Sequence, residues 1–143
     1  MKKIFTLSAT FLLAVVLLSS CVKEHVVVPN NEAYWLNQDE GEVVYVDPSC
    51  NYWVLETNYG YDVIRTTSGN MPYEGDRIYG NLRSRGSGNL YNYSGRYVFG
   101  ATITDYWVTY SEALDILDYY CPIYGKTEGQ TRVFKTATKL KKN

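Results

Sequence analysis

The sequence predicts a small, mainly β domain, built as a five-stranded barrel or an antiparallel sheet with one short helix. Five runs rich in β-branched and aromatic residues follow one another at short spacing, with Gly, Pro, Asn and Ser between them. One segment has the apolar spacing of a helix face. An interior glycine indicates the bend that closes a small barrel. An open antiparallel sheet or a small sandwich is the alternative.

The five expected strands cover residues 41–47, 52–57, 61–67, 76–85 and 97–110. Residues 58–60, Asn-Tyr-Gly, supply the turn between the second and third strands. Gly80 is the candidate bend in the fourth strand. Residues 86–95, GSGNLYNYSG, are predicted to form a long hairpin loop, and the last strand is expected to break at Gly100 or Asp105.

A helix is expected after the last strand. Ser111 is the expected N-cap, and Glu112 lies in the first turn, where an acidic residue is favourable. Pro122 ends the segment, in which four residues share one helix face: Ala113, Leu114, Leu117 and Cys121. The Tyr119-Tyr120 pair leaves a final strand as the alternative. Residues 131–138 have enough β-propensity for an edge strand.

The order of these features resembles an OB-fold, a five-stranded barrel. In that resemblance Gly41-Glu42-Val43 opens a bent first strand, and residues 52–67 form the second and third strands. Glu74-Gly75-Asp76-Arg77-Ile78 then leads into the next strand. The expected helix follows the last strand, which departs from the usual OB arrangement.

The first residues have the form of a bacterial export signal. Lys2 and Lys3 precede an apolar run over residues 4–18, which is short for a membrane span of about 20 residues. Leu18-Ser19-Ser20-Cys21 resembles the lipobox of bacterial lipoproteins. The resemblance covers about the first twenty residues and implies lipidation of Cys21, whose several acyl chains make a stable anchor. An ordinary secretory signal is the alternative.

The lipoprotein resemblance implies a place in the bacterial cell envelope. Val22, where Asp often marks inner-membrane retention, favours the outer membrane, and Lys23 and Glu24 do not decide whether the domain faces the periplasm or the outside. The expected plan is a signal peptide (1–20), a lipid-anchored tether (21–40), a β-barrel-like domain (41–125) and a basic tail (126–143).

Two cysteines remain after the anchor, Cys50 and Cys121. Because an exported protein meets oxidising conditions, we expect a disulfide between them, which would stabilise the fold by on the order of 4 kcal/mol. Two free buried thiols are the alternative. No metal or other cofactor is expected, since there is no Cys-x-x-Cys and the single histidine, His25, lies in the expected tether.

Charge divides the chain into an acidic body and a basic tail. Residues 22–125 carry six basic and fourteen acidic side chains, a net charge of −8, whereas residues 126–143 carry six basic and one acidic, a net charge of +5. A solvated terminus is the favoured interpretation of this tail. The alternatives are a tail that folds back onto the body, or one that contacts anionic lipid or a polyanionic glycan. Nucleic acid is not an expected partner.

Catalysis is not expected. The predicted domain contains no histidine for a triad, and no Gly-x-Ser-x-Gly motif occurs. The glycine-rich segment at residues 86–95 lacks the Lys-Ser/Thr of a phosphate-binding loop. The close carboxylates Glu74 and Asp76, and Asp115 and Asp118, are interpreted as solvated charges.

Binding has more support, because the chain contains fifteen tyrosines and three tryptophans. Tyrosine combines a large rigid contact area with a polar tip, and arginine offers a donor fork to carboxylate or sulfate groups. The expected ligand-binding residues lie in or beside turns: Tyr59, Tyr61, Tyr73, Arg83, Arg85, Tyr91, Tyr93 and Arg96. The alternative is that these tyrosines form cross-strand pairs.

The three tryptophans have different expected places. Trp53 and Trp107 fall in strands and are expected to fill the core, and Trp35 is expected to pack on the rim or close the barrel's open end. The leading hypothesis is a lipid-anchored envelope binding module that presents a Tyr-rich loop surface to a glycan, peptide or protein. A structural or accessory subunit that docks through a sheet edge or the basic tail, and a small enzyme inhibitor, are the alternatives.

Overall fold

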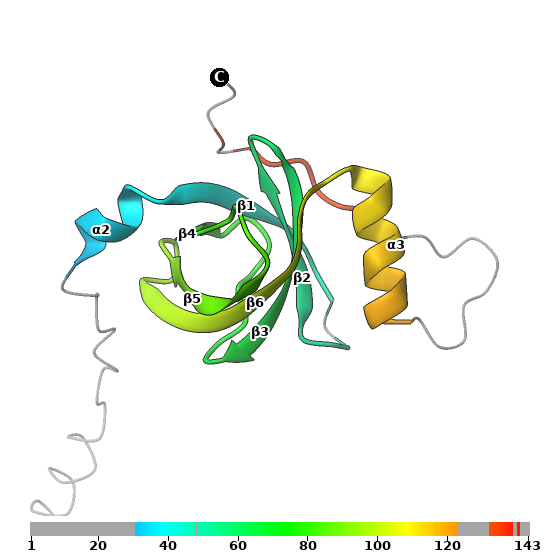
Figure 1. The fold of residues 1–143 in the computed structure, drawn as a ribbon, viewed down its shortest axis with the longest axis horizontal. Helices are drawn as coiled ribbons and strands as arrows, with labels where there is room; N and C mark the ends of the chain where they lie inside the picture. The colour runs from blue at the N-terminus through cyan, green and yellow to red at the C-terminus, as the bar shows by residue number, and fades with distance from the viewer. Residues whose placement is uncertain (1–30, 48, 123–131, 139, 141–143) are drawn as a thin grey trace, which may run out of the picture.

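The protein folds as a closed antiparallel β-barrel with a helix at each side, as a computed structural model shows for residues 31–47, 49–122, 132–138 and 140 (Figure 1). The elements are α2 (Glu32–Leu36), β1 (Asp39–Val46), β2 (Tyr52–Thr57), β3 (Gly60–Ser68), β4 (Arg77–Gly80), β5 (Gly86–Asn92), β6 (Tyr97–Val108) and α3 (Tyr110–Tyr120). The strands follow the order β1-β2-β3-β6-β5-β4 around the barrel, and β4 pairs with β1 to close it.

Alternation along the strands separates an inner core from an outer one. Val43 points into the barrel and Val44 out of it, and Leu55 and Val54 divide in the same way, as the two-residue period of a strand requires. The inner core draws side chains from all six strands and from the β4–β5 loop: Val43, Trp53, Leu55, Ile64, Ile78, Leu82, Leu90, Phe99, Ala101 and Ile103. The barrel interior is thus a packed core and not a channel.

The outer core lies under α3 and a C-terminal segment. Ala113 and Leu117 of α3 pack against outward-facing valines of β1, β2 and β3, and Phe134 joins the same cluster. Lys135 donates its backbone N–H to the Val44 carbonyl at 2.9 Å, which lays the C-terminal segment along β1 (Figure 1). For residues 132–138 the structure therefore shows a tail folded back onto the body, and no strand is formed there.

Helix α2 covers the outer face of the sheet at β4 and β5. Trp35 packs on Tyr91, with ring centroids 6.0 Å apart, and the Tyr91 hydroxyl donates to Glu32 at 2.8 Å. α2 and the start of β1 fall within the range assigned to the tether. The structure has two helices, so the prediction of a single helix was wrong. The sequence around α2 did not predict a helix, because the apolar contact that holds it comes from Tyr91 in a distant strand.

The prediction of five strands was also wrong, because the barrel has six. The additional strand, β5, lies in the segment expected to be a hairpin loop, and the strand expected over residues 76–85 ends at Gly80. The first four residues of β5 are Gly, Ser, Gly and Asn, which disfavour strands, yet all seven residues of β5 pair with β6. Six strands in a closed barrel also differ from the five-stranded OB-fold. Pairing with a long neighbour overrides local propensity here.

The helix after the last strand is confirmed, with a different cap. Thr109, not Ser111, is the N-cap of α3: its hydroxyl accepts from the Glu112 backbone N–H, and the Glu112 carboxylate accepts from the Thr109 N–H at 2.8 Å. This is a capping box, which satisfies two backbone donors that the first turn leaves unpaired. Backbone and side-chain hydrogen bonds from Thr109 lower the pKa of Glu112.

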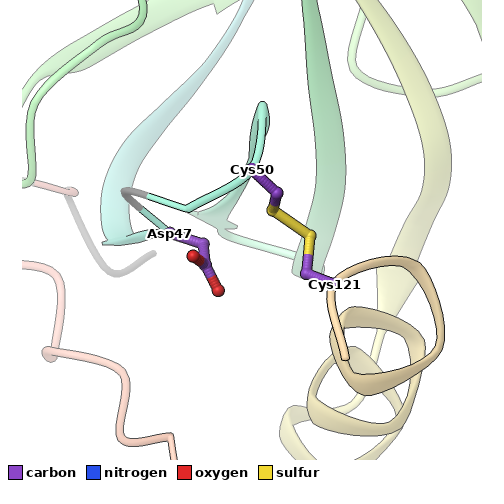
Figure 2. A group of neighbouring side chains, drawn as sticks. All are labelled: Asp47, Cys50 and Cys121. Carbon is purple, nitrogen blue, oxygen red and sulfur yellow. A yellow bond between two sulfur atoms is a disulfide. The ribbon is translucent and has the colours of Figure 1, made fainter. Parts of the chain in front are cut away.

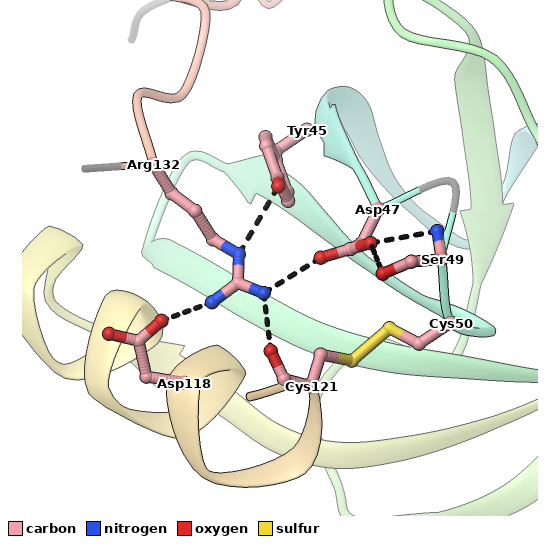
Figure 3. Close-up of a disulfide and its surroundings, with 7 residues drawn as sticks. All are labelled: Tyr45, Asp47, Ser49, Cys50, Asp118, Cys121 and Arg132. Atoms are coloured by element: carbon pink, nitrogen blue, oxygen red, sulfur yellow. Dashed lines mark hydrogen bonds and ion pairs between the residues drawn. A yellow bond between two sulfur atoms is a disulfide. The ribbon is translucent and has the colours of Figure 1, made fainter. Parts of the chain in front are cut away.

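The predicted disulfide between Cys50 and Cys121 is confirmed, with sulfur atoms 2.01 Å apart and a sequence separation of 71 residues (Figure 2). It ties the β1–β2 connection to the end of α3. Beside it, the buried Arg132 guanidinium donates to Asp47, to the Tyr45 hydroxyl and to the Cys121 carbonyl, and pairs with Asp118 (Figure 3). These contacts fix the C-terminal segment next to the disulfide.

The signal peptide, the lipobox with Cys21, His25 and most of the tether lie outside the described residues, as does the rest of the basic tail. Within the described part of the chain, no helix is long and apolar enough to cross a membrane.

Candidate functional site

The candidate site lies at the end of the barrel where β1 begins. Four segments meet at this end: the start of β1, the β2–β3 turn, the β4–β5 loop and the end of β6. Their positions follow from the strand pairs Asp39↔Gly80, Thr57↔Gly60 and Tyr61↔Val108. Short connections at one end of a barrel are a common place for binding residues, because a rigid scaffold positions them.

The β2–β3 turn presents Tyr59 to solvent. The Thr57 hydroxyl accepts from the Tyr59 backbone N–H and donates to the Gly60 carbonyl at 2.9 Å, which fixes the turn. Gly60 has φ +137°, and a Cβ there would lie 2.8 Å from the Val108 carbonyl oxygen. Only glycine fits at this position. The Tyr59 side chain remains 61% exposed.

A β-bulge in β6 places Trp107 opposite Tyr59. Tyr61 pairs with Val108, and Val63 pairs with Asp105. The chain thus advances two residues along β3 and three residues along β6 between these two pairs, which leaves one additional residue in β6. The additional residue lets Trp107 adopt a left-handed conformation, with φ 55°. Its ring then lies against Tyr59, with centroids 4.7 Å apart, and Trp107 is 40% exposed. The expectation that Trp107 fills the core was wrong, whereas Trp53 is fully buried as expected.

A hollow of about 110 Å³ opens beside the two rings, and its lining is Asp39, Glu40, Thr57, Asn58, Tyr59, Leu82 and Trp107. Asp39 accepts two hydrogen bonds from Arg83, from Nε at 2.8 Å and from Nη2 at 2.6 Å. The same guanidinium lies 5.8 Å from the Tyr59 ring centroid. The lining therefore combines two aromatic rings with carboxylate, hydroxyl and amide groups, and the Arg83 guanidinium lies beside Asp39 and Tyr59.

Asp62 lies on the inward side of β3, because it pairs with the inward-facing Leu55. It is fully buried, and its Oδ1 accepts from the Trp107 backbone N–H at 2.9 Å. Among the described residues nothing bonds to its Oδ2. Burial raises the pKa of Asp62 to about 7, the Trp107 hydrogen bond partly opposes this rise, and the charge of Asp39 adds to it.

A second hollow, of about 130 Å³, lies on the other side of the β4–β5 loop. Its walls include Arg85, Ser87, Asn89 and the inward-facing Ala101 and Ile103. Gly86 and Gly88 leave this space open, because a Cβ at either position would meet nothing within 4 Å. Arg85 also forms an ion pair with Asp105, which does not line the hollow. This second hollow has no aromatic wall.

One group of potential metal ligands occurs in the described residues: Asp47, Cys50 and Cys121 (Figure 2). The two sulfur atoms are bonded to each other, and the Asp47 carboxylate accepts from Ser49 and Arg132. Because thiolates are the form that binds metal, the oxidised trio does not provide a ligand set.

The sequence-predicted ligand residues do not gather on one surface. Tyr59 and Arg83 lie at the barrel end, and Arg85 lines the second hollow. Tyr61 packs against Tyr110 and Phe134 under the C-terminal segment. Tyr73, 79% exposed, lies between β3 and β4.

The remaining three predicted residues lie on the outer face at α2. Tyr91 is fully buried beneath Trp35, and Tyr93 contacts the edge of Tyr91. Arg96 pairs with Glu32 and lies 5.0 Å from the Tyr93 ring centroid. These three residues pack against one another or against α2, and none of them lines the hollow at the barrel end.

Sequence reasoning missed Trp107, Asp39 and Asp62 as parts of the site. The one sequence feature that could have indicated the position of Trp107 is Asp105, where the last strand was expected to break. A bulge does follow, at residues 106–107, but its effect on side-chain direction depends on the register with β3. No family model, curated protein or solved structure matches this chain.

Proposed function

We propose that the protein is a lipid-anchored binding module of the bacterial cell envelope, whose barrel end binds a glycan in the hollow beside the paired rings of Tyr59 and Trp107. The observation that carries the proposal is the paired, solvent-exposed rings beside a hollow with polar walls. Exposed large aromatic side chains lose the stabilisation that burial would give them, so their pairing at a hollow favours a role in recognition.

The chemistry of the hollow fits a saccharide. The C–H faces of a sugar stack on aromatic rings, and its hydroxyl groups donate to carboxylates and accept from guanidinium or amide groups. Asp39 and Asn58 offer such partners in the lining, and the Arg83 guanidinium lies 5.8 Å from the Tyr59 ring centroid. A peptide ligand would use the same rings and is the alternative within this class.

Lipidation at Cys21 is part of the proposal. The ten residues 22–31 separate that cysteine from α2 and span at most about 35 Å when fully extended. The barrel would then remain close to the membrane surface, within reach of envelope polymers. Val22 supports the outer membrane as the site of anchoring.

A panel of envelope and host polysaccharides, tested by calorimetry with the mature protein in mild detergent, examines the binding proposal. We expect one glycan class to bind and Tyr59→Ala to abolish its binding. Tyr73→Ala is the control, since it removes a tyrosine that is even more exposed than Tyr59 and does not line the hollow. Equal loss with both variants, or no ligand in the panel, would refute the proposal.

Protease treatment of intact cells, with a lysed-cell control, tests the location. Loss of the protein from intact cells places the barrel outside the cell, where it meets external and host glycans. Protection until lysis places it in the periplasm and directs the search to envelope polymers. Release of the protein without detergent would contradict the lipid anchor.

A further inference from the structure

The position of Trp107 depends on an unusual backbone conformation. Trp107 has φ 55°, in the left-handed region that is strained for a residue with a side chain. Strain of this kind persists only where surrounding contacts hold it, and it concentrates at functional sites. One hydrogen bond holds the Trp107 backbone in this conformation.

That contact is with Asp62. In the bulge, the Trp107 backbone N–H donates to the Asp62 carboxylate, with a distance of 2.9 Å to Oδ1. Asp62 is itself fully buried at the end of the inner core. Burying a carboxyl group is costly, and one with an oxygen that no described residue satisfies is more so. A nonpolar residue would fill this place at lower cost.

We infer that Asp62 is a positioning residue, which accepts the Trp107 N–H released by the bulge and so holds the Trp107 ring against Tyr59. The inference rests on the proposed function for its biological meaning, but the positioning itself is measurable without ligand. Asp62 does not contact the ligand in this account, because it does not line the hollow. It acts through the backbone of Trp107.

The test compares Asp62→Ala, Asp62→Asn and Leu117→Ala in the full mature protein. NMR measures the ring-current shift that Trp107 imposes on Tyr59 ring protons, and calorimetry measures affinity for the glycan that the wild type binds. Asp62→Ala should remove the shift and lower affinity roughly tenfold, about 1.4 kcal/mol. Asp62→Asn retains an acceptor oxygen and should preserve both.

Leu117→Ala, in the outer core, controls for destabilisation alone. It should lower the melting temperature and leave the Tyr59 shift and the affinity intact. Retention of the Tyr59 shift in Asp62→Ala, or its loss in Asp62→Asn, would overturn the inference. A wild type with the Tyr59 shift but no glycan ligand would refute the proposed function alone, since the NMR comparison remains.

A second measurement covers the case in which Asp62→Ala does not fold. The Trp107 amide resonance of the wild type should titrate with a midpoint near 7, because its acceptor carboxyl has a pKa of about 7. Charged groups near Asp62 are Asp39 and, bound to it, Arg83. Asp62→Asn should abolish the titration. A flat wild-type profile, or one unchanged in Asp62→Asn, would overturn the inference.

Discussion

Arg132 donates from Nη2 to Oδ2 of Asp47 at 2.8 Å, and both side chains are more than nine-tenths buried. The pair joins the C-terminal segment to the end of β1, beside the Cys50–Cys121 disulfide (Figure 3). Burial opposes the Asp47 charge, but hydrogen bonds from Ser49 and Arg132 outweigh it and lower the Asp47 pKa. This buried ion pair is thus one of the specific contacts that hold the C-terminal segment on the barrel, together with the Lys135–Val44 backbone bond and the packing of Phe134.

Arg132→Met should lower the free energy of unfolding by about 3 kcal/mol, because it leaves a buried carboxylate without its cation. Urea denaturation measures the change. Lys135→Met is the control: Lys135 pairs with Glu74 at the surface and should cost less than about 1 kcal/mol. Equal effects of the two substitutions would show that the buried pair has no special role.

Acid should release the same contact. Because the Asp47 pKa is lowered in the folded protein, its contribution is present above the ordinary value of 3.8 and is lost as the pH falls below it. The wild type should therefore lose stability in this range more steeply than Asp47→Asn does. Parallel pH profiles for the two proteins would contradict this assignment.

Reduction of the disulfide should lower stability by about 4 kcal/mol, as loop closure over a separation of 71 residues implies. The measurement is thermal unfolding with and without reductant, with Cys50→Ser/Cys121→Ser as the variant that reductant does not affect. An unchanged wild-type melting temperature under full reduction would mean that the barrel and Arg132 alone hold α3.

Trp107→Gly should separate binding from stability. Glycine adopts the left-handed conformation of this position without strain, which offsets the lost ring contact, so the free energy of unfolding should change by less than about 1 kcal/mol. Glycan binding should be lost. Trp53→Ala, in the inner core, should instead cost about 3–5 kcal/mol. A large destabilisation by Trp107→Gly would assign Trp107 to the core.

Asp62 should make the wild type less stable as the pH rises. Its pKa in the folded protein is raised from the ordinary 3.8 to about 7, so the folded state binds the proton more tightly and stability falls between these values. Asp62→Asn should remove this decline and be the more stable protein above pH 7. Denaturation at several pH values measures it, and a wild-type profile flat over this range would contradict it.

The sequence allowed good prediction where side chains alternate. β1, β2, β3 and β6 have β-branched and aromatic residues with clear boundaries, and their strands are found as expected. β5 was not predicted, because Gly86 and Gly88 remove the apolar alternation that marks a strand. It forms a strand because it pairs with β6 along its whole length. α2 was not predicted, because the contact that stabilises it is with Tyr91, more than fifty residues away in the sequence.

The candidate site could be predicted only in part. A turn tyrosine such as Tyr59 is exposed because of local geometry, which sequence reveals. Tyr91 was expected to be exposed and is buried under α2, whereas Trp107 was expected in the core and is exposed by the bulge in β6. Both outcomes depend on which strand lies alongside, and local sequence does not contain that information.

The three indole N–H resonances of the mature protein test the central claim most directly. Trp107 borders the hollow, Trp53 is in the inner core and Trp35 of α2 packs on Tyr91, so each reports on a different region. During titration with a bound glycan, the account predicts a shift of the Trp107 indole while those of Trp53 and Trp35 stay in place. A shift of Trp35 with an unaffected Trp107 would place binding elsewhere and contradict the account.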